Sequence, residues 1–185
     1  MSSAVAPFPE TYAGIPTTTL IEAYASGPAR LRAALAGLDI VAWTAKPRPG
    51  KWSIREIALH VTDSELVGAG RIRLTRAQPG SGFFAYDENA WARVYDYQNA
   101  SVAAVERSLA LFEALRGYLL PVFEGATGTA WLHPAHHPER GEITLRNLLE
   151  LYADHSERHI GQILENRRLL GLDLALPSML ETRLY

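Results

Sequence analysis

The sequence contains no cysteine. This absence excludes disulfide bonds, thiolate metal sites and cysteine nucleophiles, so any metal ion must be bound by histidine and carboxylate side chains. A chain without cysteine also fits a reducing compartment.

Long apolar runs and basic clusters are absent as well. No window reaches the about 18 uncharged apolar residues that a membrane span requires. Residues 1–16 have neither the basic start nor the apolar centre of a secretory signal. The net charge is -2 and no local cluster of lysine and arginine offsets it, so the chain has no general attraction to nucleic acid. We therefore expect a cytoplasmic protein that binds neither membranes nor nucleic acid.

The motifs of several common enzyme classes are also missing. The sequence has no Gly-x-Ser-x-Gly, no P-loop and no Gly-x-Gly-x-x-Gly, so serine-hydrolase, NTPase and dinucleotide-binding functions have no support. What is present is an ordinary globular composition of 48% hydrophobic and 21% charged residues in 185 residues. That length and composition predict one domain over residues 1–185.

Apolar residues recur at helical spacing in four segments, whereas no run alternates with period two. The pattern predicts helices over roughly 17–37, 54–74, 101–123 and 145–170, after an irregular lead-in at 1–16. Residues 41–52 and 125–142 are expected to be loops. The predicted fold class is therefore all-α, a four-helix bundle of the up-and-down type with long loops.

Local signals mark where these helices begin, break and end. Ser53 with Glu56 has the spacing of a capping box, and Thr144 can cap the last helix. The pair Gly27-Pro28 predicts a break or kink in the first helix, because proline removes a backbone donor.

Residues 83–97 contain six aromatic side chains, far above the 9% average of the chain. One interpretation is a loop held against the bundle by aromatic burial. The other is a lid or wall of a ligand pocket, and the two are compatible. Trp91 in this segment, and Tyr152 in the last helix, are expected to pack rather than to take part in chemistry.

His155 and His159 lie four residues apart on the last predicted helix and therefore share one face. They continue an apolar ladder that includes Tyr152 and Ile163, instead of lying on the charged face. Two buried imidazoles without partners would cost a few kcal/mol. A metal ion would remove this cost, and His60 of the second helix could supply a third nitrogen. Three neutral histidines with open positions are the ligand set of a catalytic metal site.

Other roles for the candidate residues stay open. The three histidines could each be hydrogen-bonded separately to backbone and carboxylate groups. Asp63 or Glu56, three or four residues from His60, could hold its second ring nitrogen or a bound water, and Asp63 is our candidate for this supporting role.

A second group of histidines, His133, His136 and His137, lies in the predicted loop 125–142. Solvated histidines are the simpler interpretation, although His136 could move toward an open coordination position.

Three stretches together resemble the DinB/YfiT-like superfamily of metal-binding bundles. They are KWSIREIALHVTDSE at 51–65, YDENAW at 86–91 and HPERGEITLRNLLELYADHSERHIGQI at 137–163. The resemblance implies a four-helix bundle that commonly forms a homodimer, with one divalent transition metal per chain, zinc or nickel, on His60, His155 and His159. Asp154 and Ser156 depart from residues that many members have, which puts the substrate pocket in doubt but not the ligands.

The resemblance also implies a reaction. Members of the YfiT-like branch are associated with the transfer of a low-molecular-weight thiol, such as bacillithiol, onto electrophilic small molecules. The partners expected for this chain are therefore a small thiol and an electrophilic substrate. The same site is compatible with a metal-dependent hydrolase that uses bound water. A third possibility is a non-enzymatic, stress-related metal-binding bundle. Three imidazoles accept several transition metals, so the sequence does not select among them.

Overall fold

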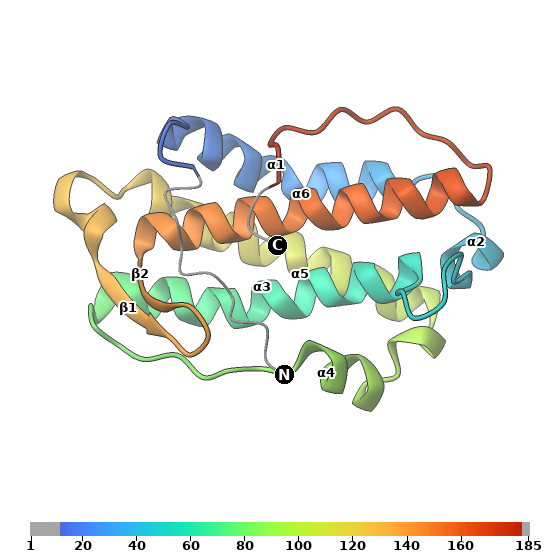
Figure 1. Cartoon of the computed structure of the whole chain (residues 1–185), viewed down its shortest axis with the longest axis horizontal. Coiled ribbons are helices and arrows are strands. Elements are labelled where there is room, and N and C mark those ends of the chain that lie inside the picture. The colour runs from blue at the N-terminus through green and yellow to red at the C-terminus, as the bar shows by residue number, and fades with distance from the viewer. Residues whose placement is uncertain (1–11, 183–185) are drawn as a thin grey trace.

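Four long helices lie side by side and form a bundle (Figure 1). The structure, a computed structural model, describes residues 12–182. The four helices are α1 (Thr17–Leu35), α3 (Ile54–Ala77), α5 (Val102–Glu124) and α6 (Leu145–Leu169). The four-helix bundle is confirmed. Most of the lead-in at 1–16 lies outside the described residues.

The connections contain more regular structure than the sequence predicts. They include the short helices α2 (Ile40–Thr44) and α4 (Glu88–Val94), and two 3-10 turns, η1 (Tyr97–Asn99) and η2 (Gly128–Leu132). A hairpin of β1 (Pro134–His137) and β2 (Gly141–Thr144) precedes α6. The expected loops at 41–52 and 125–142 are thus partly wrong, because elements of four or five residues are too short to show a period.

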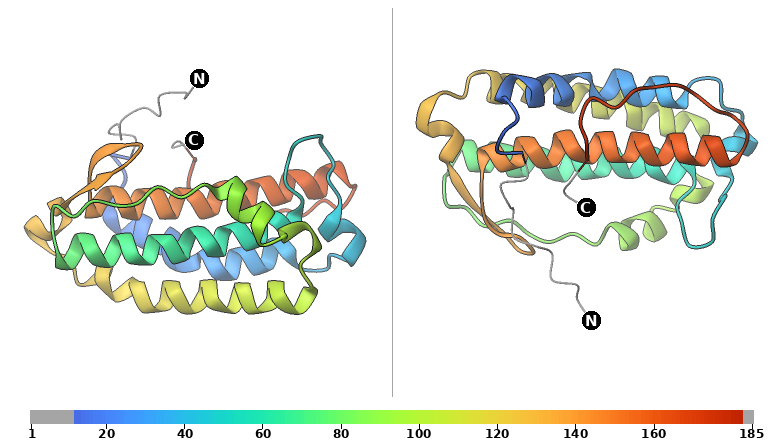
Figure 2. Two further views of the ribbon diagram at one scale, coloured as in Figure 1. Left: turned by 90° about the horizontal axis from the view of Figure 1, so that it is seen from below. Right: turned by 45° about the horizontal axis from the view of Figure 1, so that its top comes forward.

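The up-and-down arrangement expected from the sequence is not what the structure shows. Helix α3 packs against α5 and α6, and α1 packs against the same two helices. Thr62 of α3 contacts Ser108 of α5, and Glu65, later in α3, contacts Arg116, later in α5. Helices α3 and α5 therefore run parallel. Parallel neighbours need a long return connection. Residues 78–101, which include α4, supply it along the side of the bundle (Figures 1 and 2).

The sequence predicts a break or a kink at Gly27-Pro28. Helix α1 is continuous through Pro28, so a break is wrong. Proline at position 28 has no N–H to donate to the carbonyl oxygen of Tyr24, four residues earlier. Arg116 of α5 donates to that carbonyl instead, at 2.6 Å. A contact from another helix therefore replaces the missing bond, which no local signal could have indicated.

The helices that carry the candidate histidines begin as predicted. Ser53 and Glu56 form a reciprocal capping box at the start of α3, and Thr144 and Asn147 form another at the start of α6. These caps fix where each helix starts and therefore which side chains face the neighbouring helix.

The buried core consists of two apolar clusters with polar side chains between them. Along α6, one cluster ends at Ala153 and the other begins at Ile160. Along α5, the clusters meet at either side of Arg116, between Phe112 and Leu119. The candidate histidines His155 and His159 lie in this gap. Within residues 12–182, no helix is both long and apolar enough to cross a membrane.

Candidate metal centre

Three histidine nitrogens converge between α3 and α6. The Nε2 atom of His155 lies 3.1 Å from Nε2 of His60 and 3.1 Å from Nε2 of His159. All three ligand atoms lie within 4.8 Å of one another. The structure therefore brings together the three residues that the sequence singled out.

The local fold explains this convergence. Helices α3 and α6 are antiparallel neighbours, since Trp52 near the start of α3 contacts Asn166 near the end of α6. The i, i+4 spacing places His155 and His159 one turn apart on the face that meets α3. His60 points from the opposite helix into the space between them.

Burial keeps the three imidazoles neutral. His60, His155 and His159 are each less than a tenth exposed. Burial, followed by the neighbouring His159, lowers the pKa of His60 to about 2. Burial lowers the pKa of His159 to about 4, and burial followed by the other two histidines lowers the pKa of His155 well below its usual value. The neutral form is the one that binds metal ions.

A neighbouring amide orients one of the rings. His159 donates from Nδ1 to Oε1 of Gln162 at 2.9 Å, which leaves the lone pair of Nε2 directed toward the other histidines. On the other side, the ring of Trp52 lies 4.7 Å from the ring of His60 and forms an apolar wall.

The donor set fits a divalent metal ion. A tetrahedral ion with Zn–N distances of 2.0–2.1 Å places its nitrogen ligands about 3.3 Å apart, close to the spacing seen here. Hydrogen bonding between the rings is a poorer explanation, because His155 has one Nε2 position to serve two neighbours. Within residues 12–182, no further His, Cys, Asp or Glu belongs to the group. Three protein ligands leave room for a small molecule, as in catalytic rather than structural sites.

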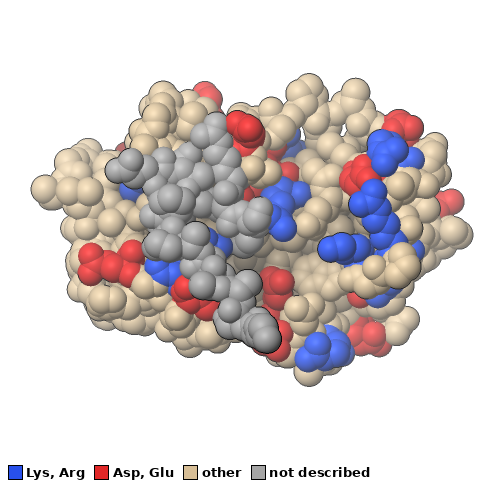
Figure 3. Space-filling view, in the orientation of Figure 1, with Lys and Arg blue, Asp and Glu red and all other residues tan. Residues whose placement is uncertain are grey.

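The site opens into a cavity of about 640 Å³. His155 and His159 line it together with Trp52, and the charged residues Arg48, Lys51, Glu88, Arg158 and Glu165 surround it. Figure 3 shows basic side chains with acidic ones among them on this face of the molecule. The cavity volume is within the range of small-molecule sites.

Glu88 on α4 is the carboxylate beside the histidines. Its Oε2 atom lies 3.7 Å from Nε2 of His60, and its side chain is 52% exposed. Burial, with a smaller effect of Glu139, raises the pKa of Glu88, which Arg158 partly opposes. The sequence pattern did not single out Glu88, because only the return connection 78–101 brings α4 to this end of the cavity.

Among the described residues, no direct hydrogen bond joins Asp63 to the second ring nitrogen of His60. Asp63 accepts a hydrogen bond from the hydroxyl of Tyr97. Glu56 accepts from the backbone of Ser53 and forms an ion pair with Lys46. The partners of both carboxylates are therefore groups around α3 other than the ring of His60.

The other three histidines lie away from the centre. His136 belongs to β1, where its backbone pairs with that of Ser81 and Phe83 while its side chain is exposed. His137 is buried, and its ring lies 6.2 Å from that of Phe83. With His133, they are outside the group of candidate ligands.

The aromatic segment at 83–97 contacts the bundle near both of its ends, through Phe83 and Tyr97. Tyr97 is buried, and Phe83 packs against the apolar core from a partly buried position. Phe84 is 68% exposed and Tyr95 is 63% exposed, so the predicted aromatic burial is confirmed for only part of the segment. Trp91 packs against the rings of Tyr86 and Tyr95, as expected of a packing residue. The segment contributes to the cavity wall through Glu88 and Asn89 rather than through its aromatic side chains.

Two further buried residues were missed by the sequence analysis. Arg116 and Glu65 are each 2% exposed and form an ion pair at 3.0 Å. A signal was available: Arg116 follows Phe112 by four residues and Glu65 follows Val61 by four, so both charges interrupt apolar stripes. Tyr152 is buried in the core, as expected.

Comparison with known proteins gives consistent matches. The sequence pattern of the DinB superfamily matches residues 23–163. The chain is 31% identical over 145 residues to the Bacillus subtilis protein named "Putative metal-dependent hydrolase YfiT", covering 78% of this chain and 80% of that protein. It is 27% identical over 136 residues to a Halalkalibacterium halodurans protein named "Putative metal-dependent hydrolase BH0277", covering 74% and 77% of the two chains.

Solved structures agree with this result. The structure of YfiT from Bacillus subtilis, described as having an unusual four-helix bundle topology, matches with a TM-score of 0.77 and 29% identity over 84% of this chain and 87% of that chain. A mycothiol-dependent maleylpyruvate isomerase matches with a TM-score of 0.63 over 88% of this chain and 69% of that chain. At 13% identity, the second match shows a shared fold and no more.

Proposed function

The chain belongs to the DinB superfamily, and from this premise we propose that it is a metal-dependent enzyme that transfers a low-molecular-weight thiol onto an electrophilic small molecule. The observation that carries the proposal is the convergence of three neutral histidine nitrogens at the edge of an open cavity. A closed site with a fourth protein ligand would favour a structural metal.

The metal would be held by His60, His155 and His159. When bound, a divalent ion favours the deprotonated form of a thiol or a water at an open position, so that a nucleophile is available near neutral pH. The histidines hold three positions and leave the side toward the cavity for substrate.

The other residues of the site would orient the substrates and accept the proton. Trp52 shields the histidines on one side, and Lys51 and Arg158 offer positive charge to acidic groups on a thiol. In the reaction, the sulfur forms a bond to the electrophilic carbon as the bond to the leaving group breaks with its electron pair. The thiol proton passes to Glu88, the carboxylate nearest to His60, and then to solvent.

Hydrolysis is the second candidate, and the names of the relatives at 27–31% identity favour it. The same cavity would then hold an ester or amide, and water would replace the thiol. A non-enzymatic metal-binding bundle is disfavoured, since nothing among the described residues closes the coordination shell.

One experiment distinguishes these functions. Protein loaded with zinc or nickel is incubated with a small thiol and an alkyl or aryl halide, and in parallel with a panel of esters, beside the His155→Ala variant as control. Thioether formed by the wild type and not by the variant supports the transferase. Turnover of esters without thioether would replace it by the hydrolase, and no turnover of either by metal-loaded protein would favour the non-enzymatic role.

The homodimer implied by the family resemblance and the cytoplasmic location stay predictions. Light scattering of the purified full-length chain tests the first, and fractionation of the cells that make it tests the second.

A further inference from the structure

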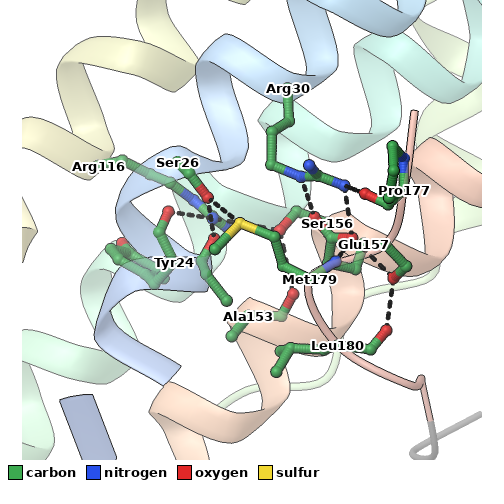
Figure 4. A network of polar contacts seen from close by, with 12 residues as sticks. Tyr24, Ser26, Arg30, Arg116, Ala153, Ser156, Glu157, Pro177, Met179 and Leu180 are labelled. Atoms are coloured by element: carbon green, nitrogen blue, oxygen red, sulfur yellow. Dashed lines mark hydrogen bonds and ion pairs between the residues drawn. The ribbon is translucent and has the colours of Figure 1, made fainter. Parts of the chain in front are cut away.

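The polar gap between the two apolar clusters holds a second buried group beside the histidines. Arg116 of α5 is 2% exposed, and its guanidinium contacts the other three long helices. Figure 4 shows Arg116 beside Tyr24 of α1. The Nε and Nη2 atoms of Arg116 each donate to Oε2 of Glu65 at 3.0 Å. Nη1 donates to the carbonyl of Tyr24 at 2.6 Å and to Oγ of Ser156 at 3.2 Å, and Nη2 donates to the carbonyl of Tyr152 at 2.7 Å. We call these five residues the arginine clasp.

The contacts of the clasp on α6 enclose one of the candidate ligands. Tyr152 precedes His155 by three residues and Ser156 follows it by one, so Arg116 holds the helical turn from which His155 projects. On α3, Glu65 lies just over one turn beyond His60. Arg116 thereby links the two helices whose histidines must meet.

Two residues of α1, Gly27 and Pro28, allow the guanidinium of Arg116 to approach this helix. A Cβ atom at Gly27 would overlap Nη1 of Arg116 and lie 3.3 Å from Oγ of Ser156. At Pro28 the missing N–H leaves the carbonyl of Tyr24 available to Arg116. From the sequence alone, the pair Gly27-Pro28 suggests a break in the helix. In the structure, Gly27 leaves space for the guanidinium, and Pro28 leaves the carbonyl of Tyr24 as an acceptor for it.

A close contact between α3 and α6 also opposes rotation of α6. A Cβ atom at Gly68 of α3 would overlap the ring of Tyr152, so this ring lies directly against the α3 backbone. Rotation of α6 about its axis would move the Tyr152 ring out of this space, and His155 would rotate with it.

Stability alone does not account for a buried ion pair at this point. Apolar residues of similar volume often replace such pairs without loss of stability. The attraction between apolar groups is also non-directional, so apart from close packing such as that of Tyr152 on Gly68 it selects the register of α6 less sharply than hydrogen bonds do. Directional bonds from one guanidinium to α1, α3 and α6 restrict both sliding and rotation of α6.

We propose that Arg116 is a positioning residue of the metal centre, which fixes the register and rotation of α6 against α3 and so sets the convergence of His60, His155 and His159. The inference rests on the metal site of the proposed function and not on the reaction. It assigns to the clasp an effect on metal affinity beyond its effect on folding.

The test compares two Arg–Glu pairs close to α6. Arg116–Glu65 is a buried pair that joins α5 to α3, and Arg30–Glu157 is a partly buried pair that joins α1 to α6. The clasp variant carries Arg116→Met with Glu65→Gln. The matched control carries Arg30→Met with Glu157→Gln, which removes the pair between α1 and α6, at 2.5 and 3.0 Å, and leaves α3 unchanged (Figure 4). Because Glu157 lies between His155 and His159 in the chain, the control is a stringent one.

Zinc affinity is measured by competition with a chromophoric chelator, and the geometry of the site by the visible spectrum of the Co²⁺-loaded protein. Residues that orient metal ligands typically change affinity by about 10- to 100-fold, so we expect a loss of at least about tenfold in the clasp variant, with an altered Co²⁺ spectrum. The control variant should bind zinc as the wild type does. Arg116→Lys, which keeps the charge beside Glu65, should recover part of the affinity.

Gly27→Ala is a milder variant that displaces the guanidinium while keeping both charges. It decides the question if the double variant does not fold, and a weaker affinity with an altered spectrum is expected again. Wild-type affinity and spectrum in a folded clasp variant or in Gly27→Ala would overturn the proposal, as would losses of affinity that simply follow the melting temperature in both Arg–Glu variants. If the wild type itself binds no zinc, nickel or cobalt, the metal site fails and the proposed function fails with it.

Discussion

The ring of Tyr152 on α6 occupies the space that a Cβ atom on Gly68 of α3 would need. This contact lies next to the turn that carries His155, on the interface where His60 faces it. Helices α3 and α6 thus approach each other closely beside the candidate metal centre, with the ring of Tyr152 against the backbone of α3 at Gly68.

Gly68→Ala should therefore destabilise the fold although alanine favours helices. Overlap with Tyr152 should cost about 1–3 kcal/mol, more than the helix propensity gained. Gly70→Ala on the same helix is the matched control, because nothing lies within 4 Å of its Cβ position. It should gain up to about 1 kcal/mol. Urea unfolding measures both, and an equal gain in both variants would contradict the packing described here.

Substitution of the three histidines should remove the metal. We expect close to one zinc or nickel ion per wild-type chain by elemental analysis, and almost none in His60→Ala, His155→Ala or His159→Ala. His136→Ala, in the exposed part of β1, serves as the control and should keep the full metal content. A stoichiometry that none of the three substitutions changes would exclude this site.

Chelation should lower the thermal stability of the wild type. A ligand at 100 times its dissociation constant stabilises the native state by about 2.7 kcal/mol. For a chain of this size, that corresponds to a shift in Tm of about 5–10 °C. Differential scanning fluorimetry with and without added zinc checks this, and the His60→Ala variant should show no response to the metal.

Glu88→Gln should slow turnover without loss of metal. If Glu88 accepts the thiol proton, its removal should lower kcat/KM by about 100-fold, in the range of general acid–base catalysis. Glu165→Gln is the control, since Glu165 lines the same cavity but forms an ion pair with Arg48 at 2.7 Å. Loss of metal content in Glu88→Gln would instead make Glu88 a fourth ligand.

The metal-free fold should lose stability in mild acid, in part through His137. Burial, followed by Arg71 and Arg140, lowers the pKa of His137 to about 4, and its Nδ1 accepts from the backbone N–H of Glu139. Between pH 6.5 and 4, the unfolded chain binds a proton at His137 that the folded chain does not, so the free energy of unfolding falls as the pH falls. Above pH 6.5 both states are neutral and this effect is absent.

The variant His137→Gln isolates this contribution. Urea unfolding of the metal-free wild type and variant at pH 7.5 and pH 5 should show a smaller loss for the variant, because glutamine does not titrate. The same comparison also subtracts the buried histidines of the metal centre, which both proteins retain. An identical loss in both proteins would mean that His137 is protonated in the fold at pH 5.

Much of this protein follows from its sequence taken locally. Apolar spacing located the four long helices, and the capping residues Ser53 and Thr144 fixed where α3 and α6 begin. The resemblance of residues 51–65 to a known family pointed to His60 as the third ligand. Apolar spacing placed His155 and His159 on one buried face. These features depend on contacts within one or two turns of a helix, which is the range over which a periodic sequence carries information.

Only the tertiary structure decided how the helices are arranged and what their buried charges contact. Periodicity shows which face of a helix is apolar but not which helix covers it or in which direction that helix runs. The parallel course of α3 and α5 therefore emerged only from their contacts, as did the approach of Glu88 to His60. Pro28 and Arg116 each look unfavourable in their own helix. In the folded bundle, Arg116 donates to the Tyr24 carbonyl that Pro28 leaves without a helical donor, and Glu65 of α3 pairs with the arginine charge.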